Sequence, residues 1–155
     1  MSNATSEAVG GDSTVPAQII RDLIPGYDGI FIPGHVPSSK NSKRVMRLKN
    51  GKTLVINSKA VMKYKKESAL YWNLGKGLFK KLLTNHDKPY RIFFLFVRKT
   101  KAKFDYINPA QTVQDIMTDH EWLVDDNCDE LVPYFLKHVV NTKHPGVYVV
   151  VKRKS

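Results

Sequence analysis

The chain has 155 residues, and its 25 lysines and arginines against 14 aspartates and glutamates give a formal net charge of +11. This length fits one domain with a hydrophobic core, and the lack of an apolar run of about 18 residues predicts that no segment crosses a membrane. The single cysteine, Cys128, excludes an intrachain disulfide framework and a multi-cysteine zinc site, and we expect it to be a small buried residue. Such a basic chain typically binds a polyanion, with nucleic acid as the first candidate.

The N-terminal part predicts a tail followed by a strand and a hairpin. Residues 1–27 are rich in small and polar side chains and predict a largely disordered tail without a signal peptide, before a single domain over residues 28–155. An apolar run at residues 29–32 is typical of a first strand. Residues 44–49 and 53–56 flank the dipeptide Asn50-Gly51, which predicts a β-hairpin.

The middle of the chain predicts a long helix and a buried strand. Ser58 can cap a helix over residues 59–83, in which apolar side chains recur at helical spacing. Gly75 and Gly77 predict a break or bend near the end of this helix. Residues 91–98 are almost continuously apolar, which indicates a central strand covered on both faces.

The C-terminal part predicts a short helix and two strands. Asn108 as N-cap, Pro109 at the first helical position and Gln111 three residues after the cap predict a helix that ends near Thr118. Residues 131–140 and 146–151 predict the closing strands. The order of elements predicts an α+β fold, a single domain with a mixed β-sheet, a hairpin and two main helices.

Charges of opposite sign are segregated along the chain. Residues 40–66 contain ten basic residues and no acid, whereas residues 104–136 contain no lysine or arginine and eight of the fourteen acids. An enzyme that brings a metal ion to phosphate needs such an acidic block beside basic residues. A solvated acidic face that balances a basic one explains the pattern equally well.

The acidic block suggests a metal site. Asp105 follows the apolar strand, and Asn108, Gln111 and Asp115 share one face of the short helix. The pair Asp125-Asp126 lies in the next loop. Carboxylates from a strand end, a helix and a second loop suit Mg²⁺, which prefers oxygen ligands. A capped helix with solvated acids is the alternative at this point.

The motifs in this region resemble one protein family. Residues 103–108 (KFDYIN), Asp115 and residues 122–127 (WLVDDN) resemble the RusA-like Holliday-junction resolvases of bacteria and phages. Upstream, residues 37–41 (PSSKN) are similar to an N-terminal segment of that family. The resemblance covers roughly residues 28–151.

This resemblance implies a RusA-like fold and a Mg²⁺-dependent endonuclease, with Mn²⁺ as a substitute and no small-molecule cofactor. It implies a homodimer that nicks four-way (Holliday) junctions in DNA recombination and repair, in the cytoplasm of a bacterial or phage-infected cell. Catalytic roles are implied for Asp105, Asp126, Asp125 and Asp115, and metal binding for Asp105, Asp126 and Asp115. We expect DNA contacts from basic and polar residues, namely Lys40, Asn41, Lys43, Arg44, Arg47, Lys99, Lys101, Lys103 and Gln111.

Two positions depart from the family pattern. Ile107 stands where the family has a second aspartate, and Gln111 stands where it commonly has a lysine. These departures motivate an alternative, a catalytically weak or inactive protein that binds branched DNA on the same fold. Charge alone motivates a third reading, a basic RNA-binding or ribosome-associated domain, and the acidic block argues against it.

Overall fold

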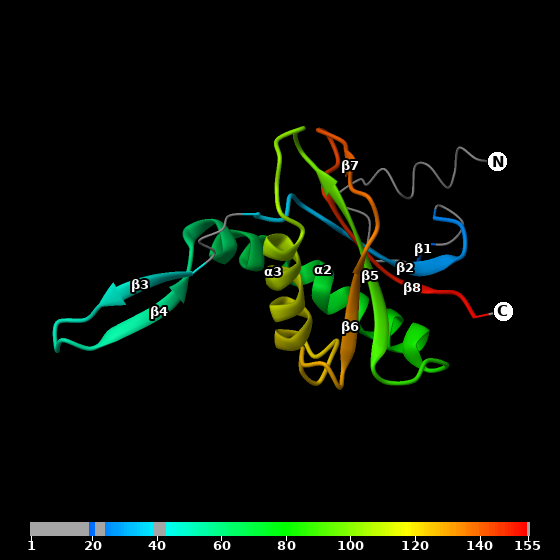
Figure 1. The fold of residues 1–155 in the computed structure, drawn as a ribbon, viewed down its shortest axis with the longest axis horizontal. Helices are drawn as coiled ribbons and strands as arrows, with labels where there is room; N and C mark the ends of the chain where they lie inside the picture. Colours follow the sequence, from blue (N-terminus) through cyan, green and yellow to red (C-terminus); the bar gives the residue numbers. More distant parts are fainter. Residues whose placement is uncertain (1–18, 21–23, 39–42, 155) are drawn as a thin grey trace.

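The fold is built on one mixed sheet. The computed structural model describes residues 19–20, 24–38 and 43–154. Six strands form the main sheet in the order β1-β2-β8-β5-β6, with β7 also paired to β5 (Figure 1). Neighbours from β1 to β5 are antiparallel, whereas β6 and β7 run parallel to β5. The strands are β1 (Ile19–Ile20), β2 (Tyr27–Pro33), β5 (Tyr90–Arg98), β6 (Leu131–Phe135), β7 (Val139–Val140) and β8 (Gly146–Lys152). An α+β domain with a mixed sheet is therefore confirmed.

Two strand predictions differ from the structure in extent. The single strand predicted over residues 131–140 is divided into β6 and β7. The Leu136 N–H still donates to the carbonyl of Phe94 in β5 at 3.0 Å, and residues 137–138 lie outside both paired segments. In addition, β1 pairs with β2, although its two residues lie within the predicted tail of residues 1–27.

Two helices, α2 (Lys59–Leu83) and α3 (Ile107–Asp119), connect the strands. The Ser58 hydroxyl accepts a hydrogen bond from the Val61 N–H at 3.3 Å, so the predicted cap of α2 is confirmed. The predicted break in α2 is wrong, since the helix continues through both glycines to Leu83. No helix among the described residues is long and apolar enough to cross a bilayer.

The start of α3 differs from the capping prediction. The helix begins at Ile107, Tyr106 occupies the N-cap position, and no side chain caps it. The Asn108 N–H donates to the carbonyl of Asp105 at 3.2 Å. Because this turn already draws Asn108 into the helix, Asn108 cannot serve as the N-cap.

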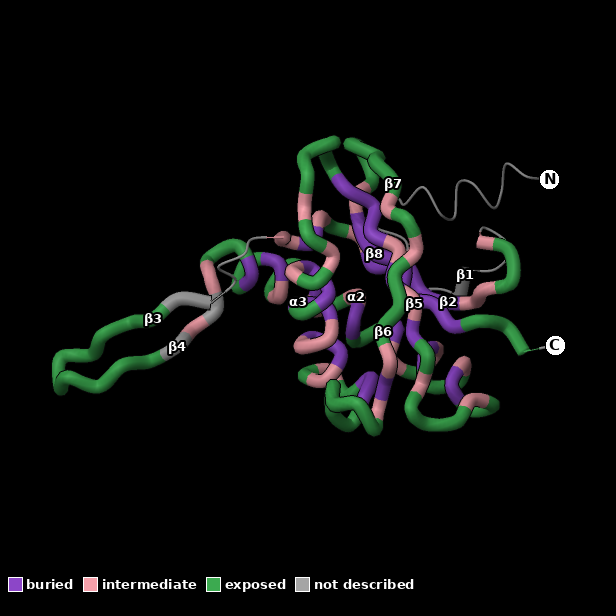
Figure 2. The backbone as a smooth tube through the Cα atoms, viewed as in Figure 1, coloured by how far each residue is buried: buried purple, intermediate pink, exposed green. Residues whose placement is uncertain are grey.

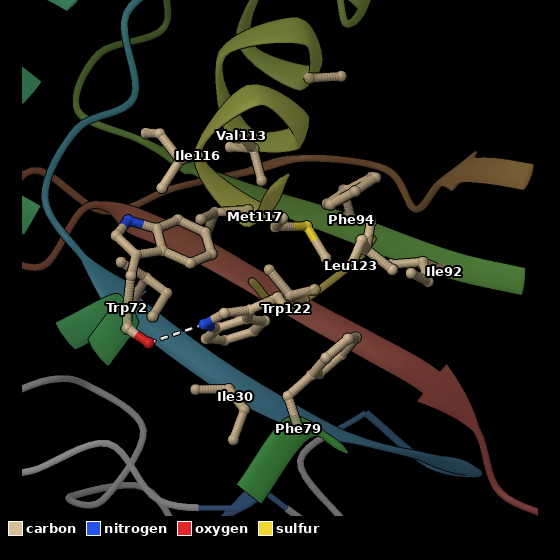
Figure 3. Close-up of a cluster of buried hydrophobic side chains, with 14 of the residues drawn as sticks. Ile30, Trp72, Phe79, Ile92, Phe94, Val113, Ile116, Met117, Trp122 and Leu123 are labelled. Atoms are coloured by element: carbon tan, nitrogen blue, oxygen red, sulfur yellow. Dashed lines mark hydrogen bonds between the residues drawn. The ribbon is translucent and has the colours of Figure 1, made fainter. Parts of the chain in front are cut away.

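Both helices pack on the same face of the sheet. Alternate strand residues such as Ile30, Phe94 and Val149 share one buried cluster with Trp72 of α2 and Ile116 of α3. The Trp122 indole N–H lies inside this cluster and donates to the carbonyl of Trp72 at 2.7 Å (Figure 3). The period-two pattern of the strands thus directs one set of side chains toward the helices.

The other face of the sheet carries a second, smaller cluster. Phe31, Val97, Tyr148 and Val150 are buried there, and Phe93 packs against them. No described helix lies on this face. The prediction of a central β5 covered on both faces fits this burial, since Val97, Tyr148 and Val150 are buried on the second face and Phe93 is half-buried there.

A hairpin projects from this body. Strands β3 (Lys43–Arg47) and β4 (Thr53–Asn57) form a separate two-stranded sheet (Figure 1). The Gly51 N–H donates to the carbonyl of Leu48 at 3.0 Å, and Gly51 has a positive φ of 83°. Since few residues other than glycine adopt this φ, Asn50-Gly51 directs the turn and the predicted hairpin is confirmed. Figure 2 shows that the hairpin is exposed along most of its described length.

Candidate functional site

A cavity of about 670 Å³ lies beside the loop that joins β5 to α3. The residues that line it combine one carboxylate with cationic, imidazole and polar groups, namely Ser38, Lys101, Ala102, Lys103, Phe104, Asp105, Tyr106, Asn108 and His138. Asp105, a predicted catalytic residue, therefore lies with Lys101 and Lys103, two of the predicted DNA contacts. Asn108, which we expected on one helix face with Gln111 and Asp115, lines the same cavity. Such a set of groups can bind a phosphate through the lysines and hold a carboxylate beside it.

Aromatic packing fixes the wall of this cavity. The ring of Phe104 stands edge-on to Phe96 at 6.4 Å, to Tyr106 at 5.1 Å and to His138 at 4.9 Å between centroids. Phe96 belongs to the core of the sheet. The loop that carries Asp105 is thereby attached to the core through an aromatic side chain, which limits its freedom to move.

Arg98 at the end of β5 connects two parts of the cavity wall. Its guanidinium donates to the carbonyl of Val36 at 2.8 Å and to the hydroxyl of Ser38 at 2.9 Å, and it lies 4.3 Å from the centre of the Phe104 ring. Arg98 is 5% exposed, and burial lowers the pKa of its guanidinium. None of the contacts described for Arg98 is with a carboxylate, so a buried cation adds positive potential near the cavity.

Tyr106 and His138 form a hydrogen-bonded pair at the same site. The backbone N–H of His138 donates to the Tyr106 hydroxyl at 3.2 Å, and this hydroxyl lies 2.9 Å from Nδ1 of His138. The hydroxyl oxygen accepts the backbone hydrogen bond, and the tautomer of His138 decides which of the two side chains donates in the second one. His138 is thereby held in one orientation on the cavity wall.

A second histidine supports the start of the loop. Nδ1 of His35 accepts the backbone N–H of Lys99 at 3.1 Å. Burial, together with the positive charges of Arg98 and Lys99, lowers the pKa of His35 to about 4. The imidazole of His35 is therefore neutral near pH 7 and acts as an acceptor that fixes the backbone of Lys99.

The predicted metal ligands are not brought together within one chain. Asp105 precedes α3 and Asp125 and Asp126 follow it, so the 13-residue helix separates them, by about 20 Å at 1.5 Å per residue. Figure 1 shows α3 as one uninterrupted helix that runs alongside the sheet between these two segments. Asp115 lies between them on α3 and is half-buried. No group of three acidic, histidine or cysteine side chains suited to a metal exists among the described residues. The expected Mg²⁺ site of Asp105, Asp126 and Asp115 therefore does not fit the geometry of a single chain.

The loop after α3 is organised by its own side chains. The carboxylate of Asp125 accepts the backbone N–H of Asp126 at 2.7 Å and the side-chain amide of Asn127 at 3.0 Å. These hydrogen bonds lower the pKa of Asp125. Both aspartates and Cys128 are exposed, so the expectation of a buried cysteine is wrong. The physical reason is that the polar residues around Cys128 close a surface turn instead of joining the core.

Other acids of the block form ion pairs. Three of them lie within 4 Å of lysines from α2 or the loop after it: Asp119 with Lys65 at 3.5 Å, Glu121 with Lys76 at 2.7 Å and Glu130 with Lys88 at 2.9 Å. The carboxylates of Asp119 and Glu121 are exposed, so these two pairs add little to stability, whereas the side chain of Glu130 is mostly buried. Much of the acidic block thus balances basic charge on neighbouring elements.

The residues expected to contact DNA fall into three groups. Arg47, Lys99, Lys101, Lys103 and Gln111 are exposed, as such contacts require. Lys43 and Arg44 lie in β3, and their side chains are outside the described part of the structure. Lys40 and Asn41 lie outside the described residues.

Sequence reasoning missed three residues of this site, Ser38, Tyr106 and His138. His138 lies 33 residues after Asp105 in the chain, and no spacing rule links them. The position of Tyr106 directly after Asp105 in the sequence was the signal that could have indicated it as a site residue. The contact between Tyr106 and His138 depends on β5 and β7 being neighbours in the sheet, which the sequence pattern did not show.

Comparison with known proteins adds no assignment. No protein-family model matches the chain, and no curated protein matches it. The cavity around Asp105 and the basic β3–β4 hairpin are the features from which a function is inferred below.

Proposed function

We propose that this chain binds branched DNA and nicks it as a RusA-like four-way-junction endonuclease, acting as a homodimer. The observation that carries the proposal is the cavity in which Asp105 lies with Lys101, Lys103, Asn108 and His138. Nicking of a phosphodiester requires a polar group next to a bound phosphate and cations that hold the phosphate, and this cavity holds both kinds of group.

The distribution of charge supports DNA as the ligand. The chain has a net charge of +11, and residues 40–66, which include the projecting hairpin, contain ten basic residues and no acid. Phosphate contacts from lysine and arginine position a duplex without reading its sequence. A protein that recognises the shape of a junction needs contacts of this sequence-independent kind.

The described residues do not assemble a Mg²⁺ donor set in one chain, so we assign no step of the reaction to a metal ion. Within the cavity, Lys101 and Lys103 would bind the phosphate, and the hydrogen bonds to Tyr106 fix the orientation of the His138 imidazole beside it. Asp105 would lie beside the reacting phosphate. A second function, binding of branched DNA without cleavage, is favoured by the separation of Asp105 from Asp126 along α3.

The two functions are separated by incubating the wild type with a synthetic four-way junction in Mg²⁺, beside a linear duplex of the same sequence and an EDTA control. We expect paired nicks on the junction in Mg²⁺ and none on the duplex. Loss of the nicks in EDTA would show that a metal ion held by carboxylates of two chains takes part. Tight junction binding without nicks in Mg²⁺ or Mn²⁺ would establish the binding function instead. Equal affinity for duplex RNA and for the junction would contradict both.

Substitutions of single aspartates test whether nicking takes place in the cavity. Asp105→Asn is expected to lower nicking at least 100-fold and to leave junction binding unchanged or tighter, because one charge that repels phosphate is lost. Asp129→Asn is the matched control, since it removes an exposed charge at the other end of α3. If Asp126→Asn also abolishes nicking, carboxylates from two chains share one site, as a homodimer permits. Wild-type nicking by Asp105→Asn would remove the cavity from the mechanism.

A further inference from the structure

The β3–β4 hairpin exposes an unusual number of apolar side chains. Val45 is 68% exposed, Met46 40%, Leu48 38% and Leu54 47%. The two strands pair with each other and with no strand of the main sheet. A two-stranded hairpin is at best marginally stable by itself in water, so these exposed apolar groups indicate a surface that acts when a partner is bound.

The charge of the hairpin selects the chemistry of that partner. Residues 43–57 contain five basic residues, Lys43, Arg44, Arg47, Lys49 and Lys52, and no acidic residue. This charge disfavours a second basic chain as the partner and favours a polyanion. The described side chains among these, Arg47, Lys49 and Lys52, are exposed.

The register of the two strands places Met46 and Leu54 on one face of the hairpin, and Val45 on the other. Met46 and Leu54 are direct cross-strand partners, so their side chains project to the same side of the hairpin. A two-stranded ribbon has the width that a DNA groove accepts, and apolar side chains inserted between bases unstack them. Bases next to a branch point have lost part of their stacking, so insertion there costs less than insertion into a continuous duplex.

The hairpin begins close to the candidate site. Ser38 lines the cavity, and β3 starts at Lys43. Five peptide steps between these residues span at most about 18 Å. One DNA junction can therefore contact the base of the hairpin and the cavity at the same time.

We propose that the β3–β4 hairpin enters the branch point of a DNA junction, with its basic residues on the phosphates and the Met46–Leu54 pair packed against unstacked bases. This inference rests on the proposed function, because it takes branched DNA as the ligand. It adds a task for the hairpin, which is to open the branch point while the cavity holds the neighbouring strand.

The test places 2-aminopurine next to the branch point of a synthetic junction, since its fluorescence rises when stacking is lost. The full chain carrying Asp105→Asn is used so that the junction stays uncut during the measurement. We expect binding of this variant to raise the fluorescence several-fold. Adding Met46→Thr and Leu54→Thr, which retain strand propensity, is expected to abolish most of that rise. The matched control adds Met62→Gln and Leu70→Gln on α2, where both side chains are at least half exposed, at 50% and 61%. We expect this control to keep the full rise.

A second measurement addresses the phosphate contacts. Arg47→Gln, Lys49→Gln and Lys52→Gln together are expected to reduce the salt slope of junction binding by about 2.7, at roughly 0.9 per phosphate contact. The two threonine substitutions are expected to leave that slope unchanged. Because all of these side chains are exposed, far-UV circular dichroism and thermal midpoint should match the wild type in every variant.

The outcomes distinguish the two proposals. If the chain that carries only Asp105→Asn does not bind the junction, the proposed function fails. If it binds and the wild type nicks, but the threonine variant keeps the full fluorescence rise, the role of the hairpin is overturned while the proposed function stands. An unchanged salt slope in the triple glutamine variant would equally overturn the phosphate contacts of the hairpin.

Discussion

Gly75 of α2 lies directly against the indole of Trp122: a Cβ atom at position 75 would stand 2.7 Å from that ring. The same atom would lie 3.3 Å from a methyl carbon of Ile30 in β2. The absence of a side chain at this position therefore lets α2 approach both the sheet and the segment that follows α3. Gly77, two residues later, lies on the exposed side of the helix, and a Cβ atom there would meet no neighbour within 4 Å.

The two glycines are expected to respond to alanine in opposite directions. Gly75→Ala should lower the free energy of unfolding by about 1–3 kcal/mol, because the added methyl group overpacks the core. Gly77→Ala should raise it by about 0.5–1 kcal/mol, because alanine is the better helix former and meets no neighbour. Urea unfolding of both variants beside the wild type measures these changes. A stabilising Gly75→Ala would show that the core can relax around the methyl group.

These glycines also illustrate what the sequence could and could not predict. Local signals were sufficient for the bounds of α2, for its Ser58 cap and for the hairpin at Asn50-Gly51, since each depends on residues adjacent in the chain. Helix propensity predicted a break at Gly75, because nothing in a propensity reveals that Trp122 packs on that position. The contact between distant segments overrides the local preference.

The candidate site, too, was predicted in part from residues that are close together in the sequence. Asp105, Asn108, Lys101 and Lys103 lie within a few residues of one another, and the structure groups them around one cavity. The expected convergence of Asp105 and Asp126 depended on the path of the chain between them. A straight helix of 13 residues fills that path and holds its two ends apart. The spacing of the motif thus predicted which residues lie in the same segment, but it did not predict the distance between Asp105 and Asp126 in the fold.

Arg98 is expected to stabilise the wall of the cavity by its geometry as well as its charge. Arg98→Met removes the donors to the Val36 carbonyl and the Ser38 hydroxyl and should lower the free energy of unfolding by about 2–3 kcal/mol. Arg98→Lys keeps the positive charge, but it cannot reach both acceptors with a planar fork and should recover less than half of that loss. Thermal and urea unfolding of both variants test this. Full recovery by lysine would show that charge alone is required.

Junction binding is expected to weaken steeply with salt, because bound lysines and arginines release counterions from the DNA. Lys101→Gln with Lys103→Gln should reduce the slope of log K against log salt by about 1.8, at roughly 0.9 per contact. Lys76→Gln is the control, since Lys76 pairs with Glu121 at the far end of α3 from the cavity, and it should leave the slope unchanged. Fluorescence anisotropy with labelled junction DNA at several salt concentrations gives these slopes. A flat salt response of the wild type would contradict phosphate binding.

Stability is expected to depend on pH through His35. The pKa of this histidine is lowered from 6.5 to about 4 in the folded chain, so below about pH 6.5 the unfolded chain binds a proton that the folded chain does not. The free energy of unfolding is therefore unaffected by this group above pH 6.5, and it decreases as the pH falls toward 4. Since His35 is half-buried, we expect the loss to be on the order of 1 kcal/mol.

The histidine contribution is isolated by comparing the wild type with His35→Asn, whose side-chain oxygen can still accept the Lys99 N–H but does not titrate. Carboxylates titrate in both proteins, so the difference between their urea midpoints at pH 7.5 and pH 4.5 reports His35. We expect the wild type to lose more stability than the variant over this range. Parallel losses would mean that His35 is protonated as readily in the folded chain as in the unfolded one, and its hydrogen bond to Lys99 would then have no part in fixing the loop.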